Sequence, residues 1–92
     1  MIDFEKNNRW EGTGPWLSVE PPYVYLLYAL MRMCQPKVIL EIGCGKGFWT
    51  QALVEGIKTY PGAFPPICVD VRDNLDPSLK AAVDFRCLDH DT

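Results

Sequence analysis

The chain has 92 residues and a mass of 10.5 kDa, which fits one small domain or part of a larger one and excludes a two-domain enzyme or a large barrel. Apolar residues make up 48% and charged residues 23%, as in globular rather than disordered chains. The net charge is −3, and no cluster of Lys and Arg provides an electrostatic footprint for nucleic acid, although RNA or DNA remains open as the substrate of a larger parent protein.

Cysteine usage and the N-terminus bear on the compartment. The four cysteines show no zinc-ligand spacing, so we expect reduced structural thiols and no metal: Cys34, Cys44, Cys68 and Cys87. The N-terminal residues have no signal-peptide pattern. The longest apolar run, Tyr23 to Met31, is nine residues, whereas about twenty are needed to cross a bilayer. These observations predict a cytoplasmic protein without membrane attachment.

The first part of the chain divides into an arm and a helix. Residues 1–19 are rich in turn formers and predict an extended N-terminal arm, so residues 20–92 form the predicted domain. A helix is expected over residues 21–34, because proline is tolerated in a first turn and an unbroken apolar stretch follows. Pro36 ends it, since the residue before proline avoids the helical region.

Strands and helices then alternate. Residues 38–42 predict a strand buried on both faces, because this β-branched run does not alternate with polar residues. Residues 48–58 predict a helix, 67–71 a second strand, and 83–88 a third. Asp76 and Pro77 are predicted to start a short helix that reaches about residue 82. The order predicts an α/β fold with parallel strands and right-handed crossovers.

A glycine loop, Gly43-Cys44-Gly45-Lys46-Gly47, joins the first strand to its helix. Glycines there allow a tight turn and close approach of a ligand to the backbone. Asp70 ends the second strand, where a carboxylate can accept hydrogen bonds from both hydroxyls of a ribose. These features predict a site for an adenosine-type cofactor. The spacing G-x-G-x-G differs from the dinucleotide-binding and P-loop patterns.

The segment from Val38 to Gly47 resembles the first motif of class I S-adenosylmethionine (SAM)-dependent methyltransferases, and Val69-Asp70 resembles their second motif. The leading helix resembles that of the branch that methylates hydroxyl groups of small molecules. The resemblance covers about residues 20–90 and implies a partial Rossmann-like parallel sheet of strand order 3-2-1, with the C-terminal half of the family fold absent. That half usually carries the groups that orient the acceptor, so no catalytic residue is named.

The same resemblance implies a role for each cofactor-binding residue. The implied set is Glu41, Gly43, Cys44, Gly45, Gly47, Asp70, Val71 and Asp89. Glu41 would contact the methionine amino group, the glycines would line the methionine and ribose, Asp70 would hold the ribose hydroxyls, and Asp89 would lie near the adenine edge. Structural alternatives stay open, because Glu41 and Asp70 could be ordinary polar residues of a strand and its end, and Asp89 part of a solvated tail.

Other residues admit two interpretations as well. His90, between two aspartates, could bind a metal or lie in an acidic loop. Trp10, Trp16 and the tyrosines of the first helix could line a substrate pocket, but core packing is the favoured role.

For the whole chain, the main hypothesis is the SAM-binding half of a methyltransferase with a small-molecule acceptor. The alternatives are a non-catalytic SAM- or nucleotide-binding module, or a truncated relic.

The order 3-2-1 leaves the first strand at an edge of the sheet. An apolar edge strand exposes unpaired N–H and C=O groups and recruits other chains. We therefore expect either self-association through this strand or a longer methyltransferase of which the chain is the N-terminal part.

Overall fold

The computed structural model describes residues 21–88. Helices and strands alternate along this part of the chain, which confirms the α/β prediction. The elements are α1 (Pro21–Cys34), β1 (Leu40–Ile42), α2 (Phe48–Ile57), β2 (Ile67–Asp70), α3 (Pro77–Lys80) and β3 (Asp84–Cys87). The predictions for the N-terminal arm, Trp10, Trp16, Asp89 and His90 lie outside the described residues.

The three strands form one open sheet in which both neighbouring pairs are parallel. The order runs β1-β2-β3. The predicted order 3-2-1 names the same strands from the opposite edge, and β2 lies in the centre in both. The register aligns Glu41 with Cys68 and Cys68 with Phe85. These three side chains therefore share one face of the sheet, because neighbouring strands keep their pleats in phase.

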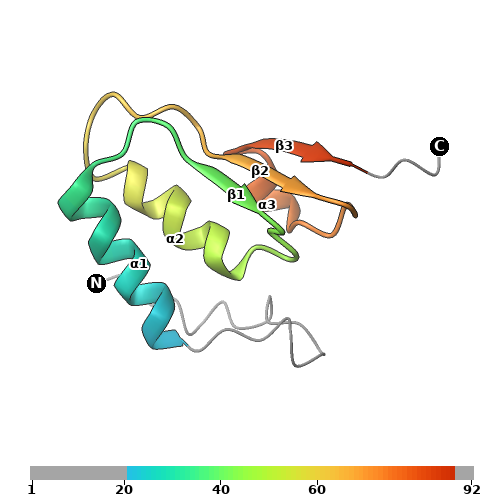
Figure 1. Ribbon diagram of the computed structural model, residues 1–92, viewed down its shortest axis with the longest axis horizontal. Helices are drawn as coiled ribbons and strands as arrows, with labels where there is room; N and C mark the ends of the chain where they lie inside the picture. The colour runs from blue at the N-terminus through green and yellow to red at the C-terminus, as the bar shows by residue number, and fades with distance from the viewer. Residues whose placement is uncertain (1–20, 89–92) are drawn as a thin grey trace.

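The helices cover the face that carries Cys68. Figure 1 shows α1 and α2 together below the sheet and α3 behind β2 and β3. The core beneath that face joins all three helices to Cys68 through Val24 of α1, Ala52 of α2 and Leu79 of α3. Cys68 is fully buried. The glycine loop and the ends of the strands are thus supported from one side only.

The first two helices pack closely at Gly56. A Cβ on Gly56 would lie 2.6 Å from the Cβ of Met31, so only glycine permits this approach of α1 to α2. Val24 and Met31 of α1 are buried, whereas Met33 is 78% exposed. The packing of α1 on α2 therefore uses one stripe of α1.

The prediction that the first strand is buried on both faces is wrong. Val38, Leu40 and Ile42 are 69%, 60% and 79% exposed. Among the described residues no helix covers this second face of the sheet, so side chains that alternate away from Glu41 face outward. The strand is also shorter than predicted, because regular pairing with β2 begins at Leu40. We call Val38, Leu40 and Ile42 the outer face of β1.

Element ends follow local chemistry. The side chain of Asp76 accepts a hydrogen bond from the backbone N–H of Ser78 at 2.9 Å, which confirms the predicted helix start with proline in the first turn. The helix α3 ends at Lys80, two residues before the predicted end, and α2 ends at Ile57. Within residues 21–88, no helix has both the length and the apolar character needed to span a membrane.

Candidate functional site

The glycine loop leaves the carboxyl end of β1 and leads into α2. Gly43 N–H donates to the Val69 carbonyl at 2.7 Å, so the loop starts by extending the pairing of β1 with β2. Gly43, Gly45 and Gly47 have φ values of 80°, 57° and 107°, which residues with a side chain rarely adopt. The backbone conformation of the loop therefore requires glycine at alternate positions, as the sequence has it.

The three glycines differ in what surrounds them. No atom beyond the chain neighbours lies within 4 Å of a Cβ built on Gly43 or Gly45. A Cβ on Gly47 would lie 2.5 Å from Cδ1 of Leu79 and 2.8 Å from Cδ1 of Leu75. Gly43 and Gly45 thus border open space that a ligand can enter, whereas Gly47 is required for packing against α3 and the loop before it.

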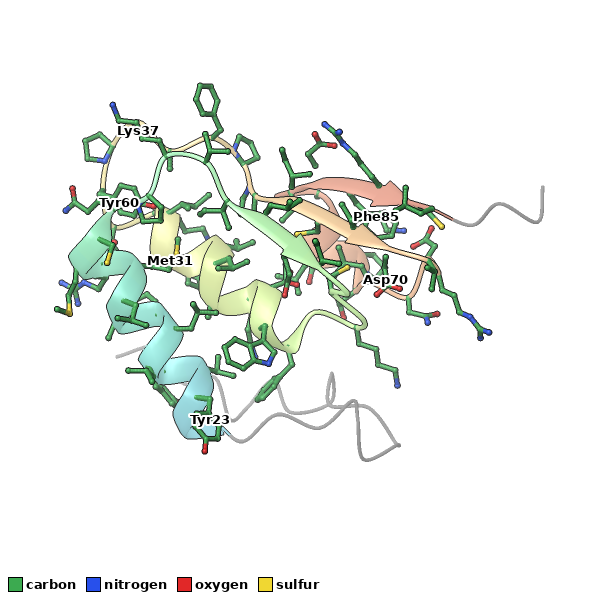
Figure 2. The ribbon with its side chains drawn as sticks, in the orientation of Figure 1. Tyr23, Met31, Lys37, Tyr60, Asp70 and Phe85 are labelled. Atoms are coloured by element: carbon green, nitrogen blue, oxygen red, sulfur yellow. The ribbon has the colours of Figure 1, made fainter. Side chains whose placement is uncertain are left out.

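Asp70 brings the carboxyl end of β2 to the glycine loop. Its Oδ2 accepts a hydrogen bond from Gly45 N–H at 2.7 Å, and its Oδ1 accepts one from Arg72 N–H at 3.2 Å. Figure 2 shows Asp70 at the end of β2, beside the loop that follows β1. Each carboxylate oxygen has more than one lone pair, so both oxygens retain capacity to accept bonds from a diol. Asp70 also fixes the loop that would hold such a ligand.

Glu41 lies one strand away from Asp70 and is half-buried. Its Oε1 accepts a hydrogen bond from Thr50 Oγ1 at 2.5 Å and one from Cys68 Sγ at 3.5 Å. Burial raises the pKa of the Glu41 carboxyl above its ordinary value, the bonds from Thr50 and Cys68 oppose this shift, and the charge of Asp70 adds to it. The two carboxyl groups therefore form a local region of negative potential that favours a cationic ligand group.

The two cysteines near these carboxyl groups are buried thiols. Cys44 and Cys68 are free and belong to the core. Burial, together with the charges of Glu41 and Asp70, raises the pKa of Cys44 to about 11, and burial also raises the pKa of Cys68. Because the thiolate is the reactive form, neither group is set up as a nucleophile. The Cys44 side chain packs in the core, so only the backbone of Cys44 is part of the candidate site in the glycine loop.

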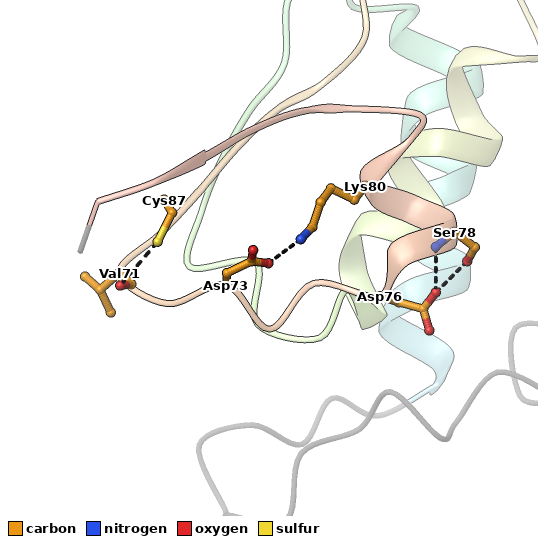
Figure 3. A network of polar contacts seen from close by, with 6 residues as sticks. All are labelled: Val71, Asp73, Asp76, Ser78, Lys80 and Cys87. Carbon is orange, nitrogen blue, oxygen red and sulfur yellow. Dashed lines mark hydrogen bonds and ion pairs between the residues drawn. The ribbon is translucent and has the colours of Figure 1, made fainter. Parts of the chain in front are cut away.

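The segment after β2 is held against the glycine loop. Asp76 N–H donates to the Lys46 carbonyl at 3.1 Å, which connects the start of α3 to the loop. Figure 3 shows three further contacts of this segment: an ion pair of Asp73 with Lys80, the bonds from Ser78 to Asp76, and a bond from the Cys87 thiol to the Val71 carbonyl. The Val71 side chain is exposed. These contacts fix the backbone next to Asp70.

The structure brings together four of the eight predicted cofactor residues. Glu41, Gly43, Gly45 and Asp70 meet at the carboxyl ends of β1 and β2, connected by the bond from Gly45 to Asp70 and by the charge interaction of Asp70 with Glu41. Asp89 lies outside the described residues. Thr50 was not among the predicted residues, because its contact with Glu41 depends on the packing of α2 against β1 and not on a motif.

Over residues 21–88, no group of three or more His, Cys, Asp or Glu side chains is placed to hold a metal ion. The sequence matches no protein-family model and no curated protein.

Proposed function

We propose that this chain is the SAM-binding half of a SAM-dependent methyltransferase whose acceptor is a hydroxyl group of a small molecule. The observation that carries the proposal is the bond from Gly45 N–H to Asp70 Oδ2 at 2.7 Å. It holds the Asp70 carboxylate, the proposed partner of the ribose hydroxyls, beside a glycine loop with open space at two of its glycines. The negative potential of Glu41 and Asp70 supports a ligand that carries an ammonium and a sulfonium group.

The residues present fit this cofactor by their chemistry. Gly43 and Gly45 leave room against the backbone, Asp70 would accept bonds from the ribose hydroxyls, and Glu41 would accept one from the amino group. Bound SAM would supply an activated methyl group for in-line transfer. The contribution of this chain is to position that group, because orientation is the main requirement of such a displacement. A general base is needed only for a poorly nucleophilic acceptor.

The alternative is a non-catalytic SAM- or nucleotide-binding module or a truncated relic, which would use the same carboxyl groups without transferring the methyl group. Incubation with labelled SAM and a panel of hydroxyl and amine acceptors separates the two. Label in an acceptor supports the enzyme, whereas SAM binding without transfer to any acceptor supports the module.

Isothermal titration calorimetry tests the cofactor assignment. We expect binding of SAM and S-adenosylhomocysteine but not of NAD. Asp70→Asn should weaken SAM binding about tenfold or more, since it removes a charged acceptor of two hydrogen bonds. Asp84→Asn is the matched control, because Asp84 lies at the amino end of β3, the opposite end from the glycine loop. Equal affinity of the Asp70 variant and the wild type would refute the ribose contact.

The outer face of β1 supports a proposal about partners. Its exposed apolar side chains lie on an edge strand of a parallel sheet, and parallel sheets are normally covered on both faces. A cavity of about 390 Å³ opens at the amino ends of the strands, lined mostly by apolar residues, among them Val38, Phe64 and Ile67. We propose that the 92-residue chain self-associates through β1, or that the remainder of a longer methyltransferase covers this strand.

A further inference from the structure

Thr50 is a fully buried polar residue in the first turn of α2. Its hydroxyl donates to Glu41 Oε1 at 2.5 Å. The Cys68 thiol, also fully buried, donates to the same oxygen at 3.5 Å. Buried hydroxyl groups need a partner, and here the partner is one oxygen of an acidic residue on the neighbouring strand rather than a backbone carbonyl of the helix.

These two contacts give the Glu41 carboxyl group a defined orientation. Within residues 21–88, both of its hydrogen bonds end on Oε1. The two donors lie on the core side, since Thr50 and Cys68 are both 0% exposed. Glu41 itself is only half-buried. Its Oε2 accepts no hydrogen bond from these residues and is not a buried atom without a partner, so Oε2 retains access to solvent. A free carboxylate rotates about its last bond, and a donor fixed on one oxygen restricts that rotation.

We propose that Thr50 is a positioning residue that holds Glu41 by Oε1 and thereby presents Oε2 to a primary ammonium group of the ligand. This inference rests on the proposed function and deepens it, because it separates the subsite for the amino acid part of SAM from the subsite for its ribose. The groups that face Glu41 are Thr50 from α2, Cys68 and Asp70 from β2, and Cys44 from the glycine loop. The only charged group among these described neighbours is a second carboxyl group, so an ammonium group is favoured.

The test compares Thr50→Val, which keeps the shape and loses the hydroxyl, with Thr50→Ser, which keeps the hydroxyl. Two probes are titrated calorimetrically: SAM and methylthioadenosine, which has the adenosine part and lacks the amino acid. We expect Thr50→Val to bind SAM about five- to tenfold more weakly, Thr50→Ser to stay within about twofold of the wild type, and methylthioadenosine binding to be unchanged in both variants. Equal weakening of both ligands, or no change for either, would overturn the proposal.

A second measurement requires no cofactor. The side-chain carboxyl carbon of Glu41 is titrated by NMR in the full chain. Because the bond from Thr50 lowers the pKa of Glu41, Thr50→Val should raise that pKa and Thr50→Ser should restore it. An unchanged titration would overturn the positioning role. If the wild type binds neither probe while the pKa of Glu41 shifts as expected, the proposed function fails, but the hydrogen bond from Thr50 to Glu41 is confirmed. Should Thr50→Val not fold, Thr50→Ala replaces it with the same expectations.

Discussion

The carboxyl end of the sheet presents polar groups that already have hydrogen-bond partners, whereas the outer face of β1 exposes apolar side chains. At the carboxyl end, Asp70 and Glu41 already accept hydrogen bonds from their own chain, and the open space lies over glycine backbone. On the outer face, large apolar side chains are exposed, with Ile42 at 79%. Polar groups that are held in place and partly accessible fit a small ligand, whereas an apolar strand edge fits another protein segment.

The largest expected effect is a loss of stability. It tests whether Gly47 is needed for packing, unlike Gly43 and Gly45, which border open space. Gly47→Ala combines backbone strain with a clash against Leu75 and Leu79, and we expect a loss of about 3 kcal/mol in the free energy of unfolding. Gly62→Ala is the control, because Gly62 has a φ of 89° and open space around it, and should lose only about 1 kcal/mol. Thermal and urea unfolding measure both. Equal losses would show that packing against Gly47 contributes nothing.

The next effect concerns the outer face. Ile42→Lys places a charge on the apolar edge, and we expect self-association to weaken more than tenfold, as charged residues on edge strands oppose pairing. Met33→Lys is the matched control, because the Met33 side chain is 78% exposed, nearly the same fraction as for Ile42, but lies on α1. Sedimentation over a range of concentrations gives the dissociation constants. A wild-type chain that stays monomeric and stable at every concentration would contradict the self-association proposal.

The smallest effect tests whether Glu41 serves binding rather than stability. Burial raises the pKa of Glu41 above its ordinary value of 4.5, so the folded chain disfavours the charged form. The resulting cost is fully present above the folded pKa and disappears as the pH falls to the ordinary value. Glu41→Gln should therefore raise the melting temperature at neutral pH, leave it unchanged at about pH 4, and weaken SAM binding. A lower melting temperature at neutral pH would instead assign Glu41 a stabilising role.

The sequence predicted elements whose ends depend on local chemistry. The bounds of α1 follow from proline at its start and Pro36 after its end, and Asp76 starts α3 through its own side chain. The exposure of β1 could not be predicted, because an apolar run shows a tendency to be covered and not which element covers it. Among residues 21–88, no helix lies over the outer face of β1. The exposure of Ile42 is the result.

In the candidate site, the residues of the motifs could be predicted, whereas contacts made by distant segments could not. The proximity of Glu41, Gly43, Gly45 and Asp70 could be predicted, because these residues follow motif spacing along the chain. The bond from Thr50 to Glu41 could not be predicted, because it depends on how α2 packs beneath β1 and not on a local pattern. The motif likewise did not distinguish Gly47 from the other glycines, since its neighbours Leu75 and Leu79 come from a distant segment.

We propose above all that SAM binds at the carboxyl ends of β1 and β2. Amide NMR spectra of the full chain during a SAM titration test this most directly, because they locate the ligand as well as detect it. We expect saturable shifts centred on Gly43, Gly45 and the backbone after Asp70, with no such shifts on titration with NAD. Shifts confined to the amino ends of the strands, or a spectrum unchanged by SAM, would contradict it.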